Sequence, residues 1–74
     1  MNIYIIKHKT GQIMSVNRTI LGCSMELYGL DIKSIGGLEA SCESLQTALA
    51  TSPHVECLDN NGQAYIAERH FVSN

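Results

Sequence analysis

Charged side chains are scarce in this sequence, and long apolar runs are absent from it. Only 16% of the 74 residues are charged, which is little for a fully solvated surface and favours one that is partly covered in use. No run of about 18 apolar residues occurs, so we expect no transmembrane helix. The apolar run at the start covers only residues 3–6 before Lys7, which is too short for a signal peptide. We therefore expect a cytoplasmic protein with no membrane association.

The net charge of the chain is slightly negative. A value of −2 is unlike that of most nucleic-acid binders, which are positively charged. Hydrophobic residues make up 45% of the chain, which argues against disorder. A chain of this length is expected to form one small domain, residues 1–74, that buries only about 60% of its unfolded surface. A partner or a second copy would add to the modest stability of such a domain.

Motifs that carry chemistry are also missing. Cys23, Cys42 and Cys57 are odd in number and widely spaced, which favours reduced thiols packed in a core. His54 and Cys57 are three residues apart on an expected strand, where they point to opposite faces, and zinc needs four ligands. Gly36-Gly37 lacks the spacing of a phosphate loop. We therefore predict no catalytic residue, no metal site and no cofactor, and we do not expect an enzyme.

The N-terminal region predicts a β-hairpin. Residues 2–8 and 13–17 are the expected strands, joined by a turn that contains Gly11. The favoured pairing sets Ile5 opposite Val16 and Lys7 opposite Met14. One face of the hairpin then carries Ile3, Ile5, Met14 and Val16. The other carries Tyr4, Ile6, His8 and Ile13, so both faces are apolar and both need cover.

Residues 19–28 permit two interpretations. As a strand they alternate cleanly, with Leu21, Cys23, Met25 and Leu27 on one face. As a helix they would be capped by Asn17 and ended by Gly29, with Gly22 inside at a cost of about 1 kcal/mol relative to alanine. The alternation favours the strand.

The central region predicts an extended segment and then a helix. Residues 31–40 are expected to be extended, with Gly36-Gly37 as a bulge or bend. Ser41 is a candidate N-cap for a helix over 42–51, which Pro53 follows. A start at Leu38 is the alternative.

The C-terminal region predicts a second hairpin. Its arms are 54–58 and 63–71, and Asn61-Gly62 between them is a strong turn signal. A loop of two or four residues places Val55, Cys57, Ala64 and Ile66 on one face. The reverse face then carries Glu56, Leu58, Tyr65, Ala67 and Arg69. A three-residue loop would separate the apolar residues of the two arms, so we do not expect it.

Together these elements predict an α+β fold. It has a single antiparallel sheet of about five or six strands arranged as a β-meander, one helix packed on one face, and the C-terminal hairpin. No internal sequence repeat is found. A ten-residue helix is about 15 Å long and covers about three strands, which leaves part of the sheet exposed.

An exposed apolar sheet predicts a binding protein. We expect a small module that docks on a larger protein or complex and inhibits or modulates it. Domains of this size and build are common among the inhibitors made by phages and mobile elements, such as anti-CRISPR and other anti-defence proteins, and among antitoxins. The candidate contact residues are Tyr4, Ile6, Lys7, His8, Lys9, Ile13, Arg18, Tyr65 and Arg69.

Three alternatives remain open at this point. Residues 19–35 would remove the contact surface if they covered Tyr4, Ile6, Ile13 and Tyr65. A nucleic-acid-binding module would use Lys7, Lys9, Arg18 and exposed tyrosines. A structural subunit would use the apolar surface to form a homodimer.

Overall fold

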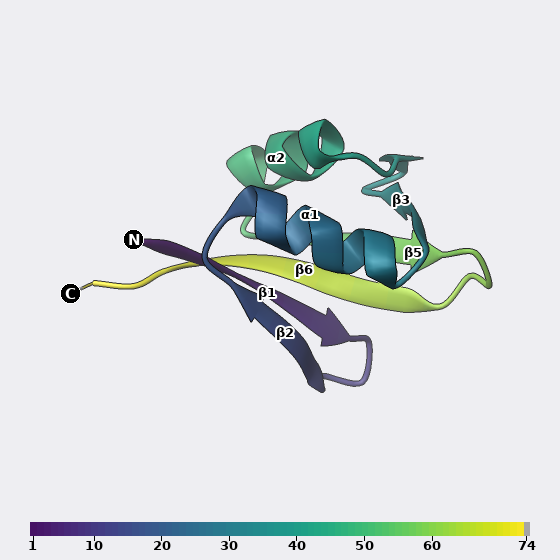
Figure 1. Ribbon diagram of the computed structural model, residues 1–74, viewed down its shortest axis with the longest axis horizontal. Coiled ribbons are helices and arrows are strands. Elements are labelled where there is room, and N and C mark those ends of the chain that lie inside the picture. The colour runs from purple at the N-terminus through teal and green to yellow at the C-terminus, as the bar shows by residue number, and fades with distance from the viewer. Residues whose placement is uncertain (74) are drawn as a thin grey trace.

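The computed structural model describes residues 1–73. Within them, six strands form one antiparallel sheet in the order β2-β1-β6-β5-β3-β4, and two helices pack on one face of it (Figure 1). The elements, in chain order, are β1 (Asn2–His8), β2 (Ile13–Asn17), α1 (Ile20–Gly29), β3 (Ile32–Ile35), β4 (Leu38–Glu39), α2 (Cys42–Thr51), β5 (His54–Asp59) and β6 (Ala64–Phe71). The predicted α+β architecture is confirmed. The single helix and the meander are wrong, because α1 is a second helix and β1 lies between β2 and β6.

The strand order has an approximate twofold symmetry. The hairpin β5–β6 lies in the centre, with β1 beside β6 and β3 beside β5. On each side, a hairpin places its second strand at the sheet edge and is followed by a ten-residue helix. In both helices the buried apolar residues lie four and eight positions after the N-cap: Cys23 and Leu27 follow Thr19, and Leu45 and Leu49 follow Ser41. The two halves share topology and core positions but not residue identities, which is why no repeat is visible in the sequence.

Residues 19–28, predicted as a strand, form helix α1 instead. The Thr19 side chain accepts a hydrogen bond from the Gly22 backbone N–H at 3.0 Å and caps the helix, the role that we had considered for Asn17. Cys23 and Leu27 face the sheet and are buried, whereas Leu21 and Met25 are exposed. The alternation in the sequence was therefore the overlap of two helical stripes, each with residues four apart.

The first hairpin matches the predicted strands, and a bulge changes part of its register. Ile5 lies opposite Val16, as expected. The register then shifts between Ile6 and Lys7, so that Lys7 lies opposite Ile13 rather than Met14. Ile13 therefore shares a face with Lys7 and not with Tyr4 and Ile6, because directly opposite residues point to the same side.

The C-terminal hairpin has a three-residue loop, so the prediction of a two- or four-residue loop is wrong. The Asp59 N–H donates to the Gln63 carbonyl at 3.0 Å, and Gly62 adopts a left-handed φ of 77°. The Asp59 carboxylate also accepts from the Asn61 and Gln63 backbone N–H groups at 2.9 and 2.8 Å, which stabilises the longer loop. Val55 consequently pairs with Ala67, and Cys57 with Tyr65. Ala64 and Ile66 lie on the other face, so the predicted assignment of faces is wrong for β6.

The middle of the chain is closer to expectation. Residues 32–35 and 38–39 are extended, and Gly36-Gly37 form the tight turn between them, both with positive φ. The helix α2 covers Cys42–Thr51 with Ser41 as its N-cap, as predicted. Its alternative start at Leu38 is wrong, because Leu38 belongs to β4.

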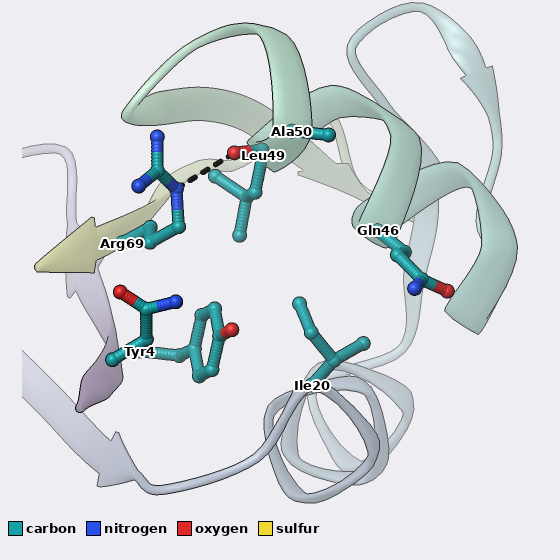
Figure 2. Close-up of a pocket in the computed structure, with 7 residues that line it drawn as sticks. Tyr4, Ile20, Gln46, Leu49, Ala50 and Arg69 are labelled. Atoms are coloured by element: carbon teal, nitrogen blue, oxygen red, sulfur yellow. Dashed lines mark hydrogen bonds between the residues drawn. The ribbon is translucent and has the colours of Figure 1, made fainter. Parts of the chain in front are cut away.

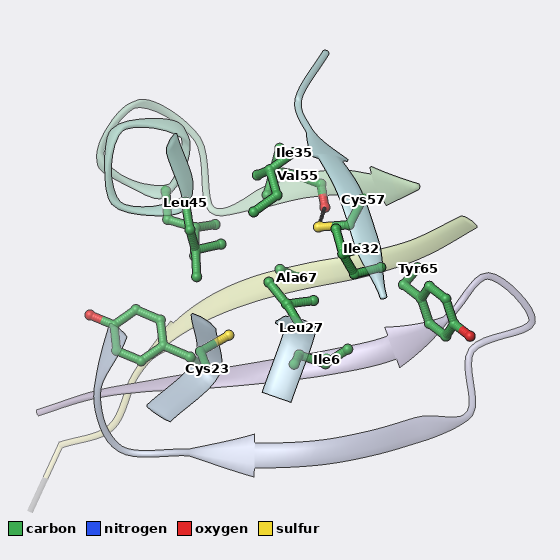
Figure 3. Packing of buried hydrophobic residues seen from close by; sticks show 12 residues of the cluster. Ile6, Cys23, Leu27, Ile32, Ile35, Leu45, Val55, Cys57, Tyr65 and Ala67 are labelled. Carbon is green, nitrogen blue, oxygen red and sulfur yellow. Dashed lines mark hydrogen bonds between the residues drawn. The ribbon is translucent and has the colours of Figure 1, made fainter. Parts of the chain in front are cut away.

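The core lies between the helices and the sheet (Figure 3). Ile6, on β1, is fully buried, and Tyr4 keeps only 9% of its surface exposed. The central residues of the cluster are Ile6, Cys23, Leu27, Ile35, Leu45, Leu49, Cys57 and Ala67. The expectation that Tyr4 and Ile6 lie on an uncovered face is therefore wrong: α1, a helix the prediction lacked, packs over β1.

Candidate functional site on the open face of the sheet

The face of the sheet that points away from both helices has no covering layer within residues 1–73 (Figure 1). Strand register identifies its residues, since directly opposite side chains share a face and Tyr4 and Ile6 point to the helices. We call this surface the open face. On strands β2, β1, β6 and β5 it consists of Ile3, Ile5, Lys7, Ile13, Val16, His54, Glu56, Leu58, Ala64, Ile66, Glu68 and His70.

Apolar side chains dominate the half of the open face formed by β2, β1 and β6. Val16 and Ile13 on the edge strand are 58% and 56% exposed. Ile3, Ile5 and Ile66 on the inner strands are partly exposed. A sheet face in contact with solvent is usually polar on alternate residues, so this row of isoleucines and valine is unusual. Exposed apolar side chains gathered on one face are of the kind that mark contact sites, and Lys7 lies among them, between Ile13 and Ile66.

A compact group of charges lies beside the isoleucines. Lys7 Nζ is 3.1 Å from Glu68 Oε1, and His70 Nε2 is 2.8 Å from the same oxygen. The hydrogen bonds from His70 and then Lys7 hold the pKa of the Glu68 carboxyl below its usual value, because they favour the charged form. These charges satisfy one another, so the open face carries polar groups without a strong net charge.

The structure separates the predicted contact residues. Lys7 and Ile13 lie on the open face, but Tyr4, Ile6 and Tyr65 are buried under the helices. The proposed cover by residues 19–35 is thus correct for the β1 residues, which pack against α1, and wrong for Ile13, which is exposed.

The remaining predicted residues are spread over the helix side and the loops. His8 packs edge-on against Tyr65, with ring centres 5.5 Å apart. Lys9 and Arg18 are exposed, in the β1–β2 turn and just before α1 respectively. The exposed or partly exposed apolar residues of the open face that the prediction missed are Ile3, Ile5, Val16, Leu58 and Ile66. The sequence predicts that Ile3, Ile5 and Val16 share one face of the first hairpin. That face is the uncovered one, and the predicted contact face, with Tyr4 and Ile6, is buried.

Arg69 and Tyr4 meet in a cavity of about 300 Å³ between the helices and the N-terminal end of β1 (Figure 2). The Arg69 Nε donates to the Leu49 carbonyl at 2.8 Å, which ties β6 to the end of α2. Asn2, Ile20, Gln46 and Ala50 complete the lining. This lining has neither a pair of carboxylates nor a nucleophile next to a base, the groupings used in acid–base and covalent catalysis.

In the described part of the chain, no cysteine side chain is hydrogen-bonded to a histidine. Burial raises the pKa of the Cys23 thiol to about 11 and that of Cys57 to about 12, so both stay protonated near neutral pH. Within residues 1–73 no three histidine, cysteine or acidic side chains are grouped closely enough to hold a metal ion. The same residues contain no helix with the length and apolar character needed to cross a membrane.

Comparison with models of known protein families, with curated proteins and with solved structures gave no match to this chain. Its function is therefore inferred from the geometry of its surface.

Proposed function

We propose that this protein is a small non-enzymatic binding module that docks its open face on a larger protein and inhibits or modulates it. The observation that carries the proposal is the placement of both helices on one side of the sheet. Within residues 1–73, no second layer covers Ile3, Ile5 and Val16 on the other side. Burying them against a partner would release the water that now contacts them, which is the main driving force in protein association.

The composition of the open face favours a separate partner over a permanent homodimer through this face. Permanent interfaces resemble a domain core, whereas exchangeable interfaces combine apolar residues with polar ones. The open face has isoleucines and Val16 mainly on β2 and β1, the Lys7–Glu68–His70 group among them, and His54 and Glu56 further along on β5. This mixture stays soluble when the partner is absent and offers hydrogen bonds when it is present.

The nucleic-acid alternative loses support from the same geometry. Lys7 is paired with Glu68. Of the three tyrosines, Tyr4 and Tyr65 are buried and only Tyr28 is exposed, so no group of tyrosines is available to stack on successive bases. Lys9 and Arg18 are the exposed basic residues left from that prediction, and they lie at the two ends of β2. Two separated cations make few phosphate contacts, which does not amount to a nucleic-acid surface.

The experiment that tests the proposal is capture of a partner by the immobilised protein and by a Val16→Glu variant. The substitution places a charge next to Ile5 on the exposed edge strand, and because Val16 is 58% exposed it should leave the fold intact. We expect a specific protein, identified by mass spectrometry, to bind the unmodified chain and to be lost with the variant. The identified protein is then purified, and its affinity is measured by titration calorimetry, with a loss of tenfold or more expected (about 1.4 kcal/mol).

Leu38→Glu is the matched control. Leu38 is 60% exposed on β4 at the far edge of the sheet, so the change adds the same charge at a similarly exposed apolar residue. It should leave capture unchanged. Equal capture by the Val16 variant, with circular dichroism confirming that both variants fold, would show that the open face is not the contact.

A further inference from the structure

Helix α1 presents a second apolar surface, on the side opposite to the core. Leu21, Met25 and Tyr28 are spaced by four and three residues and so lie along one stripe of the helix. They are 62%, 66% and 85% exposed, which makes Tyr28 the most exposed of the large apolar residues in the described chain. Glu26, the one charged residue of the helix, points away from this stripe, because it is about 100° around the helix from Met25. We call these three residues the α1 stripe.

The symmetry-related helix shows that the fold does not require the α1 stripe. The same positions of α2, counted from the N-cap, are occupied by Glu43, Thr47 and Ala50. The capping and core positions are alike in the two helices, and the solvent-facing positions are polar or small only in α2. Three large exposed side chains on α1 raise the risk of aggregation without adding to the core, so a contact is their physical explanation.

We propose that the α1 stripe binds the same stripe of a second copy of this chain, with the two helices antiparallel. In such a pair Met25 lies at the twofold axis beside Met25 of the second copy, and Leu21 packs against Tyr28 of the second copy. Helices that meet through residues spaced by four and three pack side chains of one between those of the other. The contact is self-complementary, as a twofold interface must be.

Charge at the ends of α1 favours a second copy over an unrelated partner. Arg18 lies just before the N-cap and Asp31 just after the C-cap, both exposed, and neither is in a salt bridge with another described residue. In the antiparallel pair, the Leu21–Tyr28 spacing brings Arg18 next to Asp31 of the second copy, at both ends of the contact. Each copy thus supplies the opposite charge that the other needs.

This inference is independent of the proposed function, because the open face lies on the other side of the sheet from α1. Dimerisation through α1 would leave two open faces free and pointing away from one another. Three side chains per copy make a contact smaller than the roughly 800 Å² per partner of a stable interface. The dimer should therefore be of modest affinity and should dissociate on dilution.

Sedimentation equilibrium tests the dimer over loading concentrations from about 1 to 500 µM, a range that covers modest affinities. We expect the mass to rise from that of the 8.1 kDa chain towards twice that value with increasing concentration. Met25→Glu should weaken self-association at least tenfold. Thr47→Glu makes a charged residue at the equivalent position of α2 and should leave self-association unchanged.

A charge exchange then tests the antiparallel arrangement. Arg18→Asp and Asp31→Arg should each weaken the dimer severalfold, and the double variant should restore it. A chain that stays monomeric over the whole range, or a dimer indifferent to Met25→Glu, overturns the proposal. A dimer broken by Val16→Glu instead would assign self-association to the open face, and a double variant no stronger than the singles would exclude the antiparallel pairing.

Discussion

Thr19 and Ser41 occupy equivalent places at the starts of the two helices. The side-chain oxygen of each accepts a hydrogen bond from the backbone N–H three residues later, at 3.0 Å for Thr19 and 2.9 Å for Ser41. Each oxygen satisfies a donor that the helix cannot pair internally. Thr19→Ala should therefore lower the free energy of unfolding by about 1 kcal/mol. Ser41→Ala should cost more, because the Ser41 hydroxyl also contacts Ser44 Oγ at 3.1 Å.

Urea denaturation followed by circular dichroism measures both changes, as shifts in the midpoint at a constant slope. Thr19→Ser retains the accepting oxygen and is the control, with a change close to zero expected. If Thr19→Ala left the midpoint unmoved, Thr19 would not contribute to the start of α1.

Gly36 and Gly37 differ in what a side chain would meet. Both have positive φ, at 59° and 82°, which costs any residue with a Cβ some strain. A Cβ on Gly36 would also lie 3.0 Å from Val55 Cγ2, whereas one on Gly37 would meet nothing within 4 Å. Gly36→Ala should therefore be the more destabilising of the two, by about 1 kcal/mol or more beyond Gly37→Ala. Thermal unfolding of the two variants side by side tests this order, and equal midpoints would contradict it.

The strands at the two ends of the chain and helix α2 could be predicted because each carries several agreeing signals. The helix has a serine cap, an acidic first turn and a proline just beyond its end, and its predicted range is the observed one. The segment 19–28 carried two periodicities at once. Residues spaced by four from two helical stripes interleave into an alternation that imitates a strand, and only contact with the sheet distinguishes them. Thr19 is a local signal that would have favoured the helix.

The wrong prediction for residues 19–28 also caused the wrong prediction of the contact surface. With a single helix to cover the sheet, the sequence predicts that the face with Tyr4 and Ile6 is exposed. With α1 in place, that face becomes the core, and the isoleucines on the reverse side form the open face. The length of the loop at Asn61-Gly62 was the second wrong prediction. Hydrogen bonds to the Asp59 carboxylate stabilise a three-residue loop, and this loop length determines the face to which Tyr65 points.

Glu68 makes the stability of the protein depend on pH. Its hydrogen bonds to His70 and Lys7 lower its pKa in the folded state below the ordinary value of 4.5. A carboxyl group whose pKa falls on folding stabilises the protein fully above its unfolded pKa, and this contribution is lost as the pH falls through the folded value. Glu68→Gln should therefore be less stable than the unmodified chain at neutral pH, by at most about 1 kcal/mol because the group is near the surface.

The difference between the two proteins should shrink below about pH 4.5, which urea denaturation at a series of pH values measures. Glu56→Gln is the control, since Glu56 is exposed on the same face and forms no salt bridge within residues 1–73. A stability difference for Glu68→Gln that stays constant down to acidic pH would show that its effect is not electrostatic.

The three thiols should differ sharply in reactivity. Cys23 and Cys57 are fully buried, and burial raises their pKa to about 11 and about 12, so that at pH 8 at most about one Cys23 thiol in a thousand is ionised. Cys42, at the start of α2, is partly exposed. A coloured disulfide reagent should therefore modify one thiol rapidly in the native protein and all three in denaturant.

With Cys42→Ala the rapid phase should vanish. The two core thiols should then react only as fast as the domain opens, so their rate should rise with urea, and rapid native labelling of more than one thiol would mean that α1 does not stay packed on the sheet.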